Sequence, residues 1–158
     1  MAAAESLAGV DEARPGNYVF YDWMQAAVGV CRPEDVAVSV LATVISHQQG
    51  TDHCIVDAGA LALSKDQGPG PAELRRGLGP LYAGLAGAAL EPALHVTHVS
   101  QEHGFVGGAP GGLDGRLRFG ERVRIMPNHS CLTAAMFDCY HVVRGDEVLD
   151  RWTIHRGR

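Results

Sequence analysis

VAVSVLATVISH, residues 36–47, decides the fold, because it is the clearest strand in the sequence. It is rich in Val, Ile and Thr and is apolar at most positions, which is typical of a largely buried strand. Residues 48–52, QQGTD, have the composition of a hairpin turn, and residues 53–57, HCIVD, return as a second strand. We therefore predict an antiparallel hairpin over residues 36–57.

Further strands are predicted where β-branched and aromatic residues alternate or cluster. They cover 18–21, 95–100, 122–127 and a hairpin made by 139–143 and 148–154. Short helical turns are predicted for 23–31, after Gly59, and for 132–137. Residues 67–94 contain several prolines and glycines and are predicted to be an irregular insertion. The predicted fold is mainly β, an antiparallel barrel or sandwich-like domain with a few short helices.

Composition limits the function classes. The 158 residues are enough for one domain with a core. A net charge of −5 argues against a nucleic-acid partner, which needs a basic face. No apolar run reaches the roughly 18 residues of a membrane span. The four cysteines form no CxxC pair, and no secretory signal precedes them, which favours free thiols in a reducing, cytoplasmic compartment. The Ala-rich residues 1–10 are predicted to be a disordered N-terminus.

The stretch PNHSC, residues 127–131, contains the best candidate ligands. If the segment is extended, alternate side chains share a face, so His129 and Cys131 can hold one metal together. Imidazole and thiolate are the usual ligand types for Zn²⁺, and two of them leave positions open for water or substrate. A turn histidine beside a buried cysteine is the alternative. A hydrolase with Cys131 as nucleophile is disfavoured, because no third group that orients His129 is recognisable.

Six segments in order give the chain a wider resemblance. They are RPGNYVFYD (14–22), LATVIS (41–46), VDAGALALSKD (56–66), QEHG (101–104), PNHSC (127–131) and the closing Trp152 with Arg156 and Gly157. In these segments the chain resembles the C-terminal part of the D-serine dehydratase and D-threonine aldolase family. That family joins an alanine-racemase-like barrel, which binds pyridoxal phosphate, to a β-rich C-terminal domain.

The resemblance implies roles for particular residues. His129 and Cys131 match the family's two metal ligands. Gly16 and Asn17 match a turn whose backbone N–H groups hold the phosphate of pyridoxal phosphate. Glu102 and His103 match a family signature and are candidates to support the metal site. A thiolate ligand favours Zn²⁺, and with it dehydration of a D-serine-like substrate over cleavage of D-threonine.

The resemblance also implies a division of the chain. Residues 11–31 correspond to the end of the cofactor barrel, and residues 32–158 to the C-terminal β-domain. The single lysine, Lys65, does not match the family's Schiff-base lysine. We therefore expect pyridoxal phosphate only with a complete barrel, no catalysis by the lone chain, and a partner that is either a barrel or a second copy. The alternative is a non-catalytic module, zinc-binding or structural, that mediates association.

Overall fold

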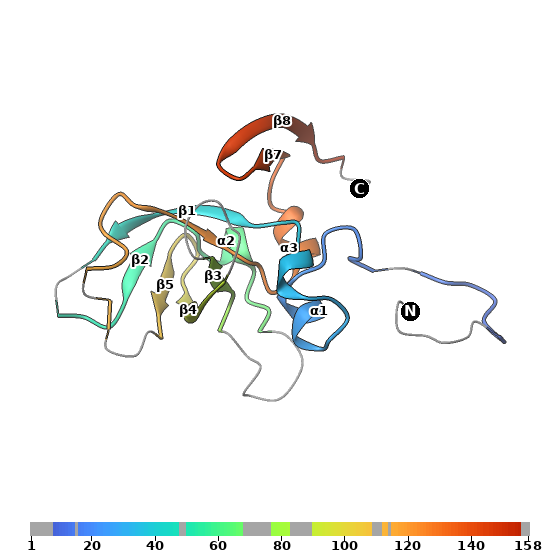
Figure 1. Ribbon diagram of the computed structural model, residues 1–158, viewed down its shortest axis with the longest axis horizontal. Helices are drawn as coiled ribbons and strands as arrows, with labels where there is room; N and C mark the ends of the chain where they lie inside the picture. Colours follow the sequence, from blue (N-terminus) through green and yellow to red (C-terminus); the bar gives the residue numbers. More distant parts are fainter. Residues whose placement is uncertain are drawn as a thin grey trace.

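The computed structural model describes residues 8–14, 16–47, 50–67, 77–82, 90–108, 112–113 and 115–155. Six antiparallel strands close a barrel in the order β1-β2-β5-β4-β3-β6 (Figure 1). These strands are β1 Val40–Ser46, β2 Cys54–Val56, β3 Pro80–Tyr82, β4 Leu90–Val99, β5 Gly104–Gly107 and β6 Arg122–Ile125. The prediction of a mainly β, antiparallel barrel is confirmed.

The core lies inside the barrel because the strands alternate between buried and exposed positions. Along β1, Val40, Ala42 and Val44 are buried, whereas Leu41 is 55% exposed. This period of two follows from the pleat of a strand, which sends successive side chains to opposite faces. Fully buried side chains from the other strands include Val56, Leu81, Val96, Val106 and Ile125. The interior is therefore filled by side chains, as in other small barrels.

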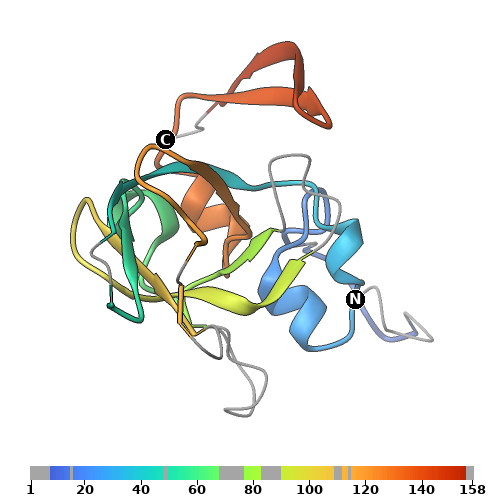
Figure 2. The ribbon, with the colours of Figure 1, turned by 60° about the vertical axis from the view of Figure 1, so that its left-hand side comes forward.

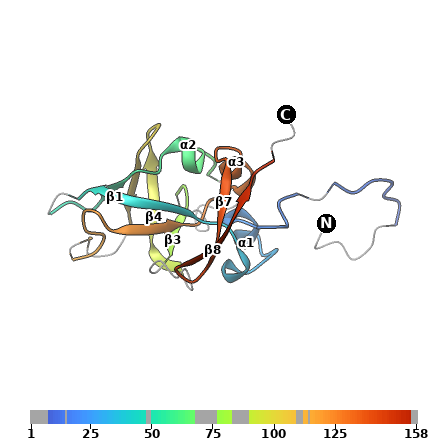
Figure 3. The same cartoon turned by 90° about the horizontal axis from the view of Figure 1, so that it is seen from above.

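Short helices gather at one end of the barrel, and a hairpin stands apart from it (Figures 1 and 2). The helices are α1 Trp23–Ala27, α2 Ala60–Leu63 and α3 Ser130–Ala134, with a 3-10 turn at Pro33–Asp35. The hairpin consists of β7 Cys139–Arg144 and β8 Glu147–Thr153, which form a separate two-stranded sheet. From above, α2 and α3 lie next to each other (Figure 3). None of the described helices has the length and apolar character needed to cross a membrane.

Two local predictions need correction. Residues 18–20 form a turn and not a strand: the Tyr21 N–H donates to the Asn17 carbonyl at 2.8 Å, and Tyr21 has φ +54°. Strands also occupy part of the segment 67–94 that was predicted to be irregular. β3 pairs with β6 and β4, so its partners are distant in sequence and local propensity gives no sign of them. Residues 68–76 and 83–89 lie outside the described residues.

Candidate metal centre

The PNHSC segment joins β6 to α3 and is mostly buried. Asn128 and Ser130 are 0% and 1% exposed, whereas His129 is partly exposed and Cys131 is exposed. The segment is extended only as far as His129, so His129 and Cys131 do not alternate along one strand. His129 is the N-cap of α3, with φ −133° and ψ 101°, and Cys131 lies in the first turn of that helix. The helix begins here because the Thr133 N–H donates to the His129 carbonyl at 3.1 Å.

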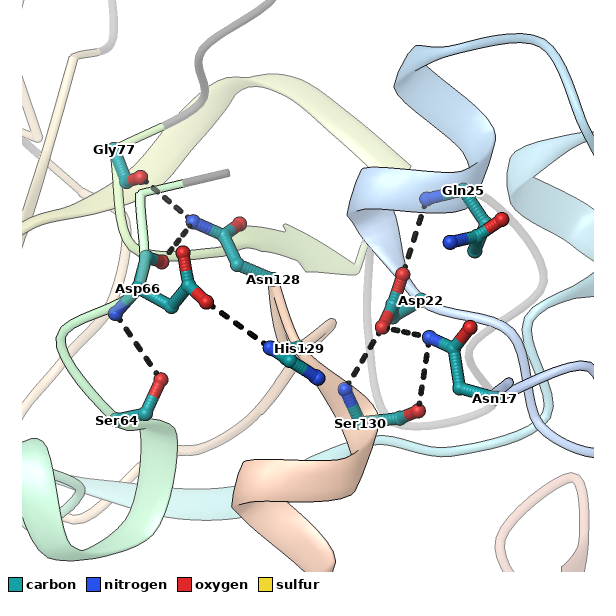
Figure 4. Close-up of polar contacts among 9 residues, drawn as sticks. All are labelled: Asn17, Asp22, Gln25, Ser64, Asp66, Gly77, Asn128, His129 and Ser130. Carbon is teal, nitrogen blue, oxygen red and sulfur yellow. Dashed lines mark hydrogen bonds and ion pairs between the residues drawn. The ribbon is translucent and has the colours of Figure 1, made fainter. Parts of the chain in front are cut away.

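His129 is paired with a carboxylate that the sequence did not single out. Its Nδ1 lies 3.0 Å from Oδ2 of Asp66, which follows α2 (Figure 4). The side chains of His129 and Asp66 are 30% and 35% exposed, so the pair lies at the surface of the domain. An ionised carboxylate only accepts hydrogen bonds, so this contact favours, for a neutral imidazole, the tautomer with the proton on Nδ1 and the lone pair on Nε2. That leaves Nε2 as the nitrogen able to bind a metal.

Asn128 holds Asp66 in place from the neighbouring position of the same segment. Its Nδ2 donates to the Asp66 carbonyl at 2.8 Å and to the Gly77 carbonyl at 2.9 Å (Figure 4). The Asp66 N–H donates to Ser64 Oγ at 3.2 Å. Ser64 has φ +65°, an uncommon value for a residue other than glycine. Both backbone groups of Asp66 are thus fixed beside His129.

A second carboxylate, Asp22, anchors the N-terminal segment to the same place. Asp22 is fully buried and caps α1 by accepting the Gln25 N–H at 3.0 Å. It also accepts the Ser130 N–H at 2.9 Å and a hydrogen bond from the Asn17 side chain (Figure 4). The Trp23 N–H donates to the Pro127 carbonyl at 3.1 Å. The sequence signal for this role was an Asp directly before a helical stretch.

The turn at Gly16 and Asn17 therefore lies next to the PNHSC segment. Asn17 Nδ2 approaches Ser130 Oγ at 3.4 Å in addition to its bond to Asp22. Within the described residues, no protein acceptor is found for the backbone N–H groups of Gly16 or Asn17. Gly16 is exposed, and a Cβ there would meet nothing within 4 Å. The turn is open to an external acceptor, but its surroundings do not by themselves form a cofactor pocket.

Tyr140 of the β7–β8 hairpin lies near Cys131. Burial raises the pKa of Tyr140, and the nearby Cys131 thiolate raises it further. The ring of Tyr140 packs against Phe20 with centroids 5.0 Å apart. Cys139, which precedes Tyr140, accepts a hydrogen bond from Arg151 at 3.1 Å. Cys131 is thus an exposed thiol close to a half-buried phenol.

Glu102 and His103 lie in the turn between β4 and β5, and both side chains are exposed. The backbone of this turn lies against the start of α2. A Cβ added to Gly59 would come within 2.4 Å of the backbone nitrogen of His103. The Leu61 N–H donates to the Gln101 carbonyl at 3.1 Å. Because α2 contacts α3, the turn reaches the metal candidates indirectly. The assignment of Glu102 and His103 to the metal site stays a prediction.

The described residues contain no group of three or more His, Cys, Asp or Glu side chains arranged to hold a metal ion. A closed structural site, which takes four such ligands, is thus not present in this part of the chain.

Lys65 is exposed. Cys54 is buried in the barrel, and burial, followed by the charge of Glu121, raises its pKa to about 11.

Comparisons with known proteins find relatives that match most of this chain. The profile of the family described as "Putative serine dehydratase domain" matches residues 37–143. The chain is 42% identical over 154 residues to D-threo-3-hydroxyaspartate dehydratase of Delftia sp. (strain HT23), covering 95% of this chain and 40% of that one. It is 40% identical over 144 residues to D-serine dehydratase of Dictyostelium discoideum, covering 87% of this chain and 34% of that one. It therefore spans about two fifths or less of these relatives.

A shorter relative is covered almost completely. An uncharacterized protein of Mycobacterium bovis is 31% identical over 138 residues, which are 84% of this chain and 92% of that one.

Solved structures of the Delftia enzyme superpose closely. A variant with a cysteine replaced by alanine, in its metal-free form, gives a TM-score of 0.86 at 40% identity and covers 99% of this chain and 42% of that one. A variant with a histidine replaced by alanine gives a TM-score of 0.83 at 39% identity. That match covers 99% of this chain and 41% of the other. In that enzyme the two replaced positions are separated by one residue. The chain belongs to the putative serine dehydratase domain family.

Proposed function

We propose that this chain is the metal-bearing domain of a lyase that dehydrates D-3-hydroxy amino acids with pyridoxal phosphate. The observation that carries the proposal is the His129–Asp66 pair, which leaves one imidazole nitrogen available next to an exposed thiol. The Delftia relative supports it, because its replaced histidine and cysteine have the spacing of His129 and Cys131 and its cysteine variant is a metal-free form.

The donor set fits a divalent metal in an open site. His129 Nε2 and the Cys131 thiolate are of the types that Zn²⁺ prefers. Two protein ligands leave positions for water and for the hydroxyl group of a substrate. A metal bound there would act as a Lewis acid on the substrate's β-hydroxyl and help it to leave as hydroxide. The role of His129 and Cys131 is to hold the ion, and the role of Asp22 is to fix helix α3, which contains Cys131.

The residues of this chain fit pyridoxal phosphate only in part. The N–H groups of Gly16 and Asn17 can face a phosphate, but the described residues offer no lysine in a pocket, since Lys65 is exposed. The cofactor would supply stabilisation of the carbanion formed at the substrate's α-carbon. We propose that a barrel, in a longer chain or a separate partner, completes that site. The named relatives support substrates of the D-serine or D-threo-3-hydroxyaspartate type.

Metal content tests the proposal directly. The purified chain, loaded with zinc and desalted, is expected to retain about one zinc per chain, and His129→Ala and Cys131→Ala are each expected to lose it. His53→Ala is the matched control, because that imidazole also pairs with an aspartate but lies in a shallow surface pocket on the barrel. Parallel His141→Ala and Cys139→Ala variants test whether the hairpin supplies further ligands. Equal zinc content in the parent and the two motif variants would contradict the proposal.

Activity tests the second part. The lone chain with zinc and pyridoxal phosphate is expected to form no 2-oxo acid from D-serine or D-threo-3-hydroxyaspartate. Addition of a separately expressed cofactor barrel from a full-length relative is expected to produce turnover that depends on His129. If zinc binds but no barrel restores turnover, the zinc-binding association module becomes the better description.

A further inference from the structure

We infer that Asp66 is a positioning residue that fixes the ring of His129 so that Nε2, and not Nδ1, is presented to the metal. The inference rests on the proposed metal site, and it assigns a role to a residue outside the PNHSC segment. Its starting observation is the 3.0 Å contact between His129 Nδ1 and Asp66 Oδ2.

The first step of the argument concerns the proton on the ring. A neutral imidazole has one N–H and one lone pair, and a metal needs the lone pair. A carboxylate 3.0 Å from Nδ1 can only accept, so its position favours the tautomer of the neutral ring in which Nδ1 carries the proton. Figure 4 shows the second ring nitrogen on the side away from Asp66. Histidine ligands of metals usually donate their other N–H to a carboxylate or carbonyl in this way, which also makes the ligand more basic.

The second step concerns the position of the carboxylate. Asp66 is held by its own backbone, through Ser64 Oγ at its N–H and Asn128 Nδ2 at its carbonyl. Asn128 is fully buried and directly precedes His129. One segment therefore supplies both the histidine and the clamp that places its carboxylate. This arrangement orients the ring before any metal arrives, and preorganisation of that kind lowers the cost of binding.

The chain contains an internal comparison. His53 Nδ1 and Asp52 Oδ1 are also 3.0 Å apart, but these residues are adjacent in sequence and their side chains are 46% and 94% exposed. Among the described residues, no buried side chain bonds to the Asp52 carboxylate, and exposed pairs contribute little. The two imidazole–carboxylate contacts have the same length, but the Asp52 carboxylate is far more exposed. Asp52 is therefore a matched control for Asp66.

The test combines zinc affinity with a measurement of the ring itself. Zinc affinity is measured by competition with a chromophoric chelator for the parent, Asp66→Ala, Asp66→Asn and Asp52→Ala. We expect Asp66→Ala to bind zinc about 10- to 100-fold more weakly, the range typical of such supporting residues. Asp66→Asn keeps an oxygen acceptor without the charge and is expected to fall between Asp66→Ala and the parent. Asp52→Ala is expected to match the parent.

Long-range ¹H–¹⁵N NMR of the metal-free chain reads which nitrogen of His129 carries the proton. The proton is expected on Nδ1 in the parent and no longer confined there in Asp66→Ala, a change that a merely structural role would not produce. An unchanged tautomer, or unchanged zinc affinity in Asp66→Ala, would overturn the inference while leaving the proposed function intact. Failure of the parent itself to bind zinc would refute the proposed function, and the inference with it.

Discussion

Replacing Asp22 by alanine is expected to destabilise the domain by about 3 kcal/mol. The carboxylate is fully buried and accepts the N–H groups of Ser130 and Gln25 as well as the Asn17 amide. Leaving the buried Ser130 N–H without an acceptor costs about 1–3 kcal/mol. Loss of the α1 cap at Gln25 costs about 0.5–2 kcal/mol. The Asn17 amide is only partly buried and can turn to water, so it adds little.

Urea unfolding followed by circular dichroism measures this difference. The comparison holds if the parent and the variants have the same m-value, the slope of the unfolding free energy against urea concentration. Asp22→Asn keeps one acceptor oxygen and is expected to lose about half as much. Asp35→Ala is the control, because Asp35 also caps a turn by accepting the Arg32 N–H at 2.9 Å but is exposed. Water replaces that bond, so its cost is expected to stay below about 1 kcal/mol.

Hydrogen exchange locates the effect. In Asp22→Ala the amides of Ser130 and Trp23 are expected to exchange faster. The amides in the barrel strands are expected to keep the same order of exchange rates as in the parent. An Asp22→Ala variant within about 0.5 kcal/mol of the parent, or one with an unchanged Ser130 amide, would refute the reasoning that this carboxylate joins the N-terminal segment to helix α3.

Further predictions concern packing and pH. Gly59→Ala is expected to cost about 2–3 kcal/mol in urea unfolding, because its Cβ meets backbone atoms at 2.4–2.5 Å, whereas Gly16→Ala, with open space, leaves stability within about 0.5 kcal/mol. Burial raises the pKa of Cys54 to about 11, from 9.0, so the folded state retains a proton that the unfolded state loses. The free energy of unfolding is thus expected to be highest below pH 9 and to fall by roughly 2 kcal/mol as the pH rises to 11. In a Cys54→Ala variant the fall caused by this thiol is expected to be absent. At pH 8 iodoacetamide is expected to modify exposed Cys131 well before buried Cys54, as peptide mapping would show.

Local sequence determined the class of fold. The β-branched run in residues 36–47, the alternation in 122–127 and the turn at 144–147 identify strands, because side chains with a period of two suit a pleated surface. These elements are present as β1, β6 and the β7–β8 hairpin. The six ordered segments were specific enough to identify the family, and His129 and Cys131 as candidate ligands came with them.

Tertiary structure decided how the candidate site is built. Asp66 and Asp22 are 63 and 108 residues away from their partners His129 and Ser130, and no periodicity in a sequence relates residues so far apart. β3 escaped prediction for the same reason, since its three residues are held by pairing with β4 and β6. Sequence alone identified His129 and Cys131 as the candidate metal ligands. Only the closed barrel and its clustered helices decided which carboxylate lies beside the imidazole, because hydrogen bonds between distant segments form only once the chain has folded.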